Sequence, residues 1–295
     1  MSYTRSSRRA RAVGIMATAF LAAPIALEAQ GGGVRTPRAD SLRTAYRLDV
    51  DGKTADARIL LQVLVTSAPD PAARAATQRA IAMSYAFDGD CANAAKYEEM
   101  VIAYWATREQ AEPQNAFYQQ GEMANEAARV CIDAGELATA EKYYKRGSEL
   151  GNKEPEPRTH PRSLWDFRLH HALARLAARH GRAGEARQHM AAARQALDSD
   201  PKMAEAQERF FPYLAGYVAL FTNDLKTSES ELTRAIALQG NENDPFMHVL
   251  LAMTYEKLGE PDRAKALYQK GYDAATGHNP PAAFARPYAR KKLRP

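Results

Sequence analysis

The feature of this chain that most constrains its fold is a short turn signature that recurs six times along the 295 residues. Each copy places Gly, or in one case Asn, where a helix would stop. These two residues best tolerate the left-handed backbone conformation that ends a helix. The turn residues are Gly52, Gly89, Gly135, Gly181, Asn223 and Gly259. The sequence therefore predicts six helical hairpins.

Small residues flank every turn at fixed distances. The positions seven residues before and five residues after the turn residue hold only Ala, Gly or Ser in all six copies. These residues are Ala45, Ala57, Ala82, Ala94, Ala128, Ala140, Ala174, Ala186, Gly216, Ser228, Ala252 and Ala264. Two helices cross closely only where the side chains between them are small. The pattern therefore predicts where the two helices of each hairpin cross.

Two copies, residues 125–147 and 251–271, show the pattern best and resemble the tetratricopeptide repeat. The matching residues are Gly135-Glu136-Leu137, Ala140, Tyr143-Tyr144 and Gly147 in one, and Leu251-Ala252, Tyr255, Gly259-Glu260-Pro261, Ala264, Tyr268 and Gly271 in the other. The resemblance covers about residues 40–275. It implies an all-α fold, a right-handed α-solenoid of about six such hairpins plus a C-terminal capping helix. Turn residues are separated by 37, 46, 46, 42 and 36 positions, whereas the family repeats every 34, so we expect an irregular solenoid.

The expected domain, residues 39–295, contains helices separated by Gly, Pro and Asp. We expect them at about 40–50, 54–66, 72–87, 92–108, 114–133, 137–150, 163–180, 184–198, 203–221, 225–238, 245–258, 261–275 and 281–293. Residues 152–161 contain three Pro and are expected to form the longest internal loop. Pro212 should kink or restart the helix in which it lies.

The N-terminus has the pattern of a secretory signal peptide at residues 1–29. Four Arg precede an apolar run, residues 13–27, that is short for a membrane span and is followed by small residues. A flexible linker is expected at 30–38. The expectation is an exported protein, periplasmic or extracellular after cleavage. The alternative is a chain anchored by an uncleaved N-terminal segment, because Leu27 is unfavourable for cleavage after Ala29.

The charge balance does not favour nucleic acid as a partner. Residues 1–29 carry four Arg and one Glu, so the rest of the chain keeps only about +2 of the formal +5. Five cations gather in the tail at 286–295 without an acid. That tail is expected to be the basic end of the capping helix. The alternative is contact with anionic lipid head groups or with an acidic partner.

The two cysteines, Cys91 and Cys131, leave two interpretations open. In stacked antiparallel hairpins, the start of one second helix meets the end of the next first helix. The two Cα atoms would then lie within the range of about 4.4–6.8 Å that a disulfide bridges. The alternative is two small buried side chains that fill contacts between helices.

Residue patterns typical of catalysis or cofactor binding are missing from the sequence. Gly52-Lys53-Thr54 lacks the preceding Gly of a phosphate-binding loop. The histidines at 170, 171, 180 and 189 include no pair four residues apart on a helix. We therefore expect no cofactor, no metal and no enzymatic activity.

In proteins that this chain resembles, the first helix of each hairpin lines the concave surface, with inward positions ten, six and two residues before the turn. Transferred to this sequence, these positions predict a groove for a ligand or partner. Its residues are Arg79, Asn125, Arg129, His171, Arg175, Arg179, Tyr213, Tyr217 and Phe221. Guanidinium groups bind carboxylates through paired donors. The alternative is that neighbouring acids such as Glu126 neutralise these arginines.

Together these features favour a non-enzymatic exported scaffold. Its partner would be a protein or extended peptide, with acidic groups, held in the concave groove. One alternative is a carbohydrate- or nutrient-binding component of an envelope uptake system. Another is an enzyme built on a helical solenoid, whose site would have to be assembled from residues distant in sequence.

Overall fold

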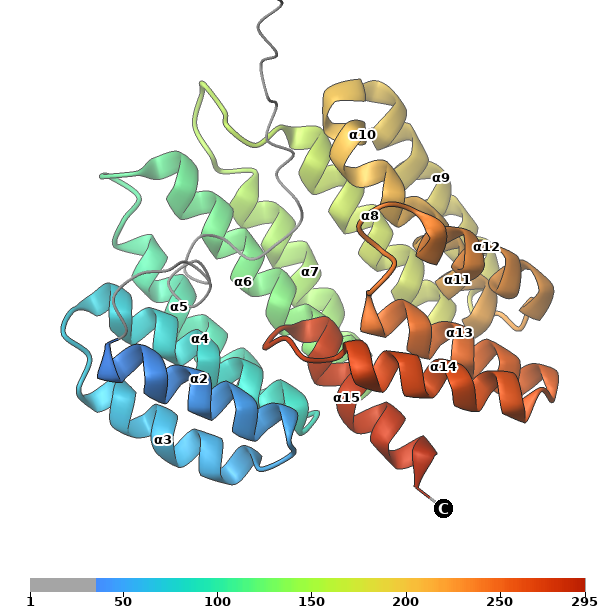
Figure 1. The fold of residues 1–295 in the computed structure, drawn as a ribbon. Coiled ribbons are helices and arrows are strands. Elements are labelled where there is room, and N and C mark those ends of the chain that lie inside the picture. Colours follow the sequence, from blue (N-terminus) through green and yellow to red (C-terminus); the bar gives the residue numbers. More distant parts are fainter. Residues whose placement is uncertain (1–35, 295) are drawn as a thin grey trace, which may run out of the picture.

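The computed structural model describes residues 36–294 and shows an all-α helical-repeat solenoid in which each hairpin packs against the next (Figure 1). Six hairpins pair α2 with α3, α4 with α5, α6 with α7, α8 with α9, α11 with α12, and α13 with α14. The helices are α2 (Pro37–Val50), α3 (Thr54–Thr66), α4 (Pro71–Phe87), α5 (Cys91–Ala106), α6 (Pro113–Ala134), α7 (Leu137–Gly151), α8 (Arg162–Arg179), α9 (Ala183–Ser199), α10 (Pro201–Gln207), η2 (Glu208–Phe210), α11 (Phe211–Phe221), α12 (Leu225–Ala237), α13 (Pro245–Leu258), α14 (Pro261–Ala274) and α15 (Pro280–Leu293).

The turns and the crossing points confirm the repeat register. All six predicted turn residues have positive φ, and Asn223, with φ 65°, is the only one of them that is not Gly. The twelve small flanking residues are all buried. At the crossing of α11 and α12, a Cβ on Gly216 would lie 2.6 Å from Cγ of Leu232. A larger residue at this position would therefore push the two helices apart.

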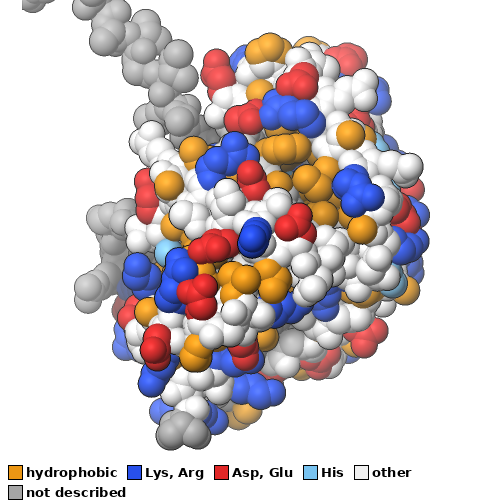
Figure 2. All heavy atoms as spheres, turned by 90° about the vertical axis from the view of Figure 1, so that its right-hand side faces the viewer, with side chains coloured by type: hydrophobic (Ala, Val, Ile, Leu, Met, Phe, Trp, Pro, Cys, Tyr) orange, Lys and Arg blue, Asp and Glu red, His pale blue; other side chains and the backbone are white. Residues whose placement is uncertain are grey.

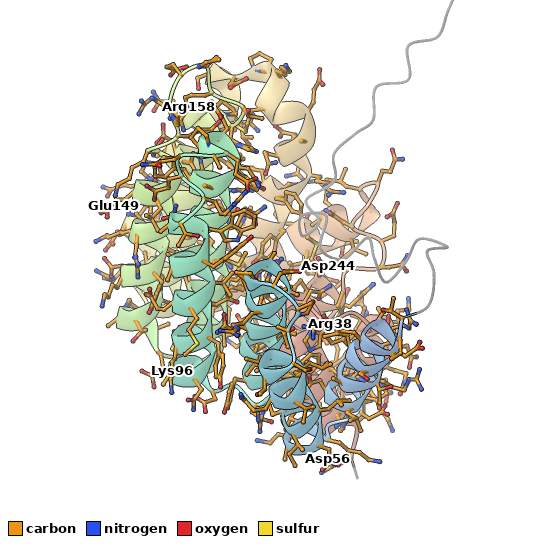
Figure 3. The ribbon with its side chains drawn as sticks, turned by 90° about the vertical axis from the view of Figure 1, so that its left-hand side faces the viewer. Arg38, Asp56, Lys96, Glu149, Arg158 and Asp244 are labelled. Carbon is orange, nitrogen blue, oxygen red and sulfur yellow. A yellow bond between two sulfur atoms is a disulfide. The ribbon has the colours of Figure 1, made fainter. Side chains whose placement is uncertain are left out.

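The first helix begins earlier than expected. Thr36 caps α2, because its side chain accepts from the backbone N–H of Ala39. Residues 37 and 38 of the expected linker therefore belong to the helix. Arg38 (Figure 3) donates to the backbone carbonyls of Leu64 and Ala73, at 2.9 and 3.1 Å, and so ties α2 to the next two helices. The expected signal peptide, residues 1–29, lies outside the described residues.

The segment expected as one helix at 203–221 is divided into α10, η2 and α11. Pro212 lies in the first turn of α11, where its missing N–H costs no hydrogen bond, so the helix restarts there as predicted. The loop at 152–161 is also confirmed. Arg158 holds it by donating to the carbonyls of Gly151, Asn152 and Glu154 at 2.8–3.1 Å (Figure 3).

The last helix returns to the first hairpin. α15 packs against α13 and α14 and also against α2, α4 and α6 (Figure 1). Nε2 of His278, just before α15, lies 2.8 Å from Oδ2 of Asp49, and Ser84 donates to the other oxygen of that buried carboxylate at 2.6 Å. Arg290 donates to the carbonyl of Val50 at 2.7 Å, at the C-terminal end of α2. These contacts close the two ends of the array onto each other.

Most cations of the basic tail contact the chain itself. Arg286 and Arg290 both donate to Val50, and Lys292 lies 2.6 Å from Glu256, while Lys291 and Arg294 are exposed. Elsewhere, on the face drawn in Figure 2, Lys and Arg side chains are interspersed with Asp and Glu.

Within residues 36–294, each helix is too short or too polar to cross a lipid bilayer.

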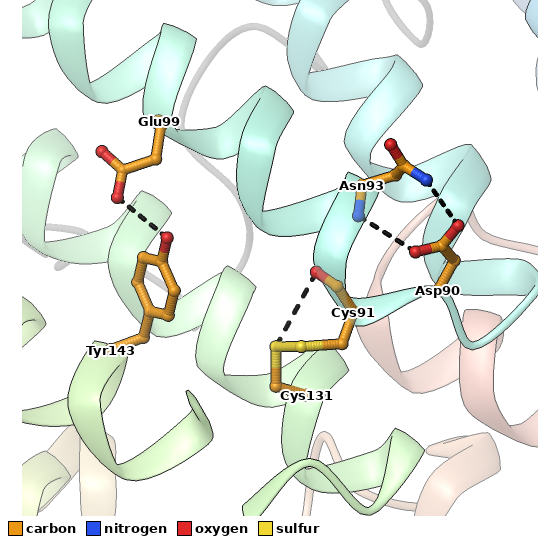
Figure 4. Close-up of a disulfide and its surroundings, with 6 residues drawn as sticks. All are labelled: Asp90, Cys91, Asn93, Glu99, Cys131 and Tyr143. Carbon is orange, nitrogen blue, oxygen red and sulfur yellow. Dashed lines mark hydrogen bonds between the residues drawn. A yellow bond between two sulfur atoms is a disulfide. The ribbon is translucent and has the colours of Figure 1, made fainter. Parts of the chain in front are cut away.

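The two cysteines lie close together, as expected for stacked antiparallel hairpins. Cys91 opens α5, Cys131 lies near the end of α6, and their sulfur atoms form a disulfide with the Cα atoms 4.7 Å apart (Figure 4). The disulfide therefore links two successive hairpins. Beside it, the side chain of Asp90 caps α5 by accepting from the backbone N–H of Asn93 at 3.0 Å.

Candidate functional site

Most of the predicted groove residues meet in one cluster of arginine and aromatic side chains. His171, Arg175 and Arg179 follow one another at four-residue spacing on α8, and Tyr213, Tyr217 and Phe221 do the same on α11, so each set lies on one helix face. Arg129 reaches the cluster from α6. Below, the arginine centre denotes these seven predicted residues together with Tyr144 of α7 and Phe246 of α13.

Arg175 lies at the middle of the arginine centre and links three helices. Its guanidinium donates to the hydroxyl of Tyr144 at 2.9 Å and to that of Tyr213 at 3.1 Å. Its Cζ also lies 5.8 Å from the ring centroid of Tyr217. With 5% of its surface exposed, Arg175 is a charged residue placed almost wholly inside the protein.

Arg129 and Arg179 also contact aromatic rings of the arginine centre. Arg129 forms an ion pair with Asp133 at 3.0 Å and stacks over the ring of Phe246, with Cζ 4.0 Å from the centroid. Arg179 donates to the carbonyl of Ile132 at 3.0 Å. Its Cζ lies 4.9 Å from the centroid of Phe221. The aromatic rings thus hold the guanidinium groups in fixed planes.

Positive charge exceeds negative charge at the arginine centre. Its three guanidinium groups face two carboxylates, Asp133 and Asp244. Burial raises the pKa of both acids, although Arg129 acts in the opposite direction on each. The Asp244 carboxylate accepts from two backbone N–H groups at the start of α13. Among residues 36–294, one positive charge is therefore left without a carboxylate in this cluster.

Three buried polar atoms of the arginine centre have no hydrogen-bond partner among residues 36–294. They are Nη2 of Arg129, Nε of Arg175 and Nε2 of His171. The other side of the His171 ring makes a hydrogen bond with the backbone of Phe210. Burial, followed by the charges of Arg175 and Arg129, holds the pKa of His171 well below its usual value. Unpaired buried polar groups are costly, so this cluster has unused capacity to bind a polar group.

Two predicted groove residues lie outside the arginine centre. Arg79 of α4 forms a two-point ion pair with Glu126 of α6, in which Nε lies 2.8 Å from Oε2. Asn125 lies against the next helix, because a Cβ on Gly147 of α7 would come 2.5 Å from its Oδ1. For Arg79, the structure shows the expected alternative of neutralisation by a neighbouring acid.

The structure also adds residues that sequence reasoning missed. Tyr144 lies on the second helix of its hairpin, which the inward-position rule leaves out. Phe246 lies at the start of α13, three residues before the first position that the rule selects. Asp133 satisfies the rule, at two residues before Gly135, and a search for acids beside the predicted arginines would have found it.

The histidines do not form a metal centre in the described part of the chain. There, no group of three His, Cys, Asp or Glu side chains is arranged to hold a metal ion. His170 and His189 approach each other with their Nδ1 atoms 3.1 Å apart, which is a hydrogen bond between two rings. A carboxylate oxygen of Glu185 lies 4.0 Å from Nε2 of His189.

Comparison with known proteins identifies one repeat of the array. Residues 247–277, which contain nearly all of α13 and α14, match the model of the tetratricopeptide repeat. The match supports a tetratricopeptide repeat family for this chain, and such repeats suggest a scaffold for protein–protein interaction. All-helical repeat folds of this type are typically non-catalytic. No curated protein matches the sequence.

Proposed function

We propose that the protein is an exported scaffold that holds a protein partner by an acidic group of that partner at the arginine centre. The observation that carries the proposal is the surplus of positive charge there, together with unpaired donors on Arg129 and Arg175. A carboxylate accepts from two guanidinium groups at once and supplies the missing negative charge.

The partner would reach the arginine centre from the side of Arg129. This side chain keeps 19% of its surface exposed, and Asp133 keeps 10%, whereas Arg175 and Tyr217 lie deeper. The stacking of Arg129 over Phe246 orients its planar group before a ligand arrives. Such preorganisation reduces the entropy that binding costs.

A peptide-selection experiment tests this assignment. Immobilised protein would be exposed to a library of acetylated, amidated hexapeptides, and bound peptides would be sequenced by mass spectrometry. We expect the wild type to enrich Asp and Glu, and Arg129→Gln to lose that enrichment at least tenfold. Arg187→Gln, an exposed arginine of α9, is the matched control and should bind as the wild type does. Equal selection of neutral peptides by all three proteins would refute the proposal.

Export is the second part of the proposal and rests on the N-terminal sequence pattern alone. Cell fractionation and mass spectrometry of the mature N-terminus test it. A periplasmic or secreted form that begins near Gln30 would support export with cleavage. An intact N-terminus in the membrane fraction would favour the anchored alternative, and an intact N-terminus in the cytosol would contradict export.

A further inference from the structure

A small pocket separate from the arginine centre is lined by residues of α4, α5 and α6. Three alanines of α4, at 72, 75 and 76, leave space opposite larger side chains of α5 and α6. Ala72 is exposed and Ala76 half-buried, whereas Ala75 is 3% exposed. The pocket therefore has an open mouth and a buried floor. We call it the α4–α6 pocket.

The volume of the α4–α6 pocket, about 150 Å³, is that of a single six-membered ring. An apolar cavity of about this size in an engineered protein admits benzene. A bicyclic ligand or an extended chain would have to protrude from the mouth, because the close-packed helices leave no further space inside. Size therefore restricts the part of a ligand that lies inside the pocket to one ring or a compact branched group.

The walls of the pocket favour an aromatic ring over an aliphatic one. The ring planes of Tyr104 and Trp105 in α5 are inclined at 64° to each other. An aromatic ligand could therefore meet the edge of one ring and the face of the other. Met123 of α6 brings a sulfur atom, which attracts the edges of aromatic rings. Arg79 forms part of the wall, and its guanidinium can make a cation–π contact with the face of a bound aromatic ring.

The charges around the pocket favour a neutral ligand. The Arg79 guanidinium is already engaged in its two-point ion pair with Glu126, and Glu122 and Glu98 also act on it. A carboxylate placed in the pocket would meet these acids without an uncompensated cation. Gln119 brings a side-chain amide to the wall. It is 4% exposed, and its amide carbonyl can accept from a ring hydroxyl.

We propose that the α4–α6 pocket binds a neutral, single-ring aromatic molecule of the phenol class. Its ring lies among Tyr104, Trp105 and Met123, and its hydroxyl points to Gln119. The site is independent of the acidic partner proposed above, because its floor and walls come from α4, α5 and α6 without any residue of the arginine centre. A ligand there would fix the spacing of two successive hairpins.

Methyl NMR of the full chain labelled at Met tests the proposal with three probes. Phenol should shift the Met123 methyl resonance saturably through its ring current, while the Met190 and Met253 methyls on distant helices stay unchanged. Cyclohexanol has nearly the same size without the π system, and benzoate has the ring with a negative charge. We expect both to bind at least fivefold more weakly than phenol.

A variant that fills the pocket provides a second test of the proposal. Ala76→Leu places a larger side chain at the mouth and should weaken phenol binding at least tenfold. Ala191→Leu on the exposed face of α9 is the matched control and should bind phenol as the wild type does. If Ala76→Leu does not fold, the comparison of phenol, cyclohexanol and benzoate binding to the wild type still tests the proposal. Equal binding of phenol and cyclohexanol, tighter binding of benzoate, or the lack of a saturable Met123 shift would overturn the proposal.

Discussion

At the scale of single residues, the chain places charged groups inside the protein and compensates most of them locally. Arg79 is neutralised by Glu126, and Asp49 receives donors from Ser84 and His278. Glu98 of α5 is less well compensated, since its buried Oε2 has no hydrogen-bond partner among residues 36–294. It is 1% exposed, and burial together with the neighbouring Glu126 raises its pKa well above the usual value.

The raised pKa of Glu98 makes stability depend on pH. The folded protein keeps a proton on this carboxyl that the unfolded chain releases near pH 4.5, so the free energy of unfolding falls as pH rises toward the folded-state pKa. Glu98→Gln places a neutral amide at this position and should abolish the fall in the free energy of unfolding that Glu98 causes as pH rises.

Urea unfolding between pH 5 and pH 8 measures the effect. We expect the stability of Glu98→Gln relative to the wild type to increase with pH. Glu149→Gln, at a residue that points to solvent from α7 (Figure 3), is the control and should follow the wild type. A pH profile of Glu98→Gln parallel to that of the wild type would show that Glu98 is ionised in the folded protein.

At the scale of helices and hairpins, the turn signature predicted the six hairpins and the small residues at their crossings. Gly and Asn at the turns, small residues at the crossings, and Pro near helix starts are local devices, so a single sequence displays them. Helix ends differ from the expected ends by at most three residues, the largest difference being at the start of α2, because several residue types can cap a helix. The arginine centre was predicted only in part, because the rule for inward positions selects first helices and leaves out Tyr144.

Overpacking a crossing tests the hairpin register. Ala140 is fully buried where α6 crosses α7, so Ala140→Leu should destabilise the protein by about 1–3 kcal/mol. Ala138→Leu, at an exposed position of the same helix, is the control. Thermal unfolding checks both. An unchanged melting temperature for Ala140→Leu would contradict the register.

The disulfide between α5 and α6 predicts a difference between oxidised and reduced protein. It closes a loop of 40 residues, which corresponds to roughly 3–4 kcal/mol of stabilisation on the loop-entropy estimate. We expect a Cys91→Ala and Cys131→Ala double variant to lose stability of that order and to become insensitive to reductant. Two free thiols in the unreduced, denatured wild type would show that the bond does not form.

At the scale of the whole molecule, the closure of the array was not predictable from the sequence. Whether the two ends of a solenoid meet depends on the small rotation between successive hairpins, summed over the array. The unequal spacing of the turns leaves that sum undetermined. The contact between Asp49 and His278 joins residues 229 positions apart, and neither residue belongs to a repeated position.

Removing the closing contact should loosen α15. His278→Ala leaves the buried Asp49 carboxylate with one fewer donor, at a cost of about 1.5–3 kcal/mol. We expect faster amide hydrogen exchange over α15 and a larger radius of gyration by small-angle scattering. Lys292→Ala removes a half-exposed ion pair with Glu256 and serves as the control, with a change below about 1 kcal/mol. Unaltered exchange in His278→Ala would mean that packing alone holds α15.

The closed array also limits how this chain can change its length. Open solenoids gain or lose whole repeats readily, because each unit contacts only its neighbours. Here an added or deleted hairpin would move Val50 and Asp49 away from Arg290 and His278. Repeat number and end-to-end contact are therefore coupled, and growth by duplication of a hairpin would first require the two ends to separate.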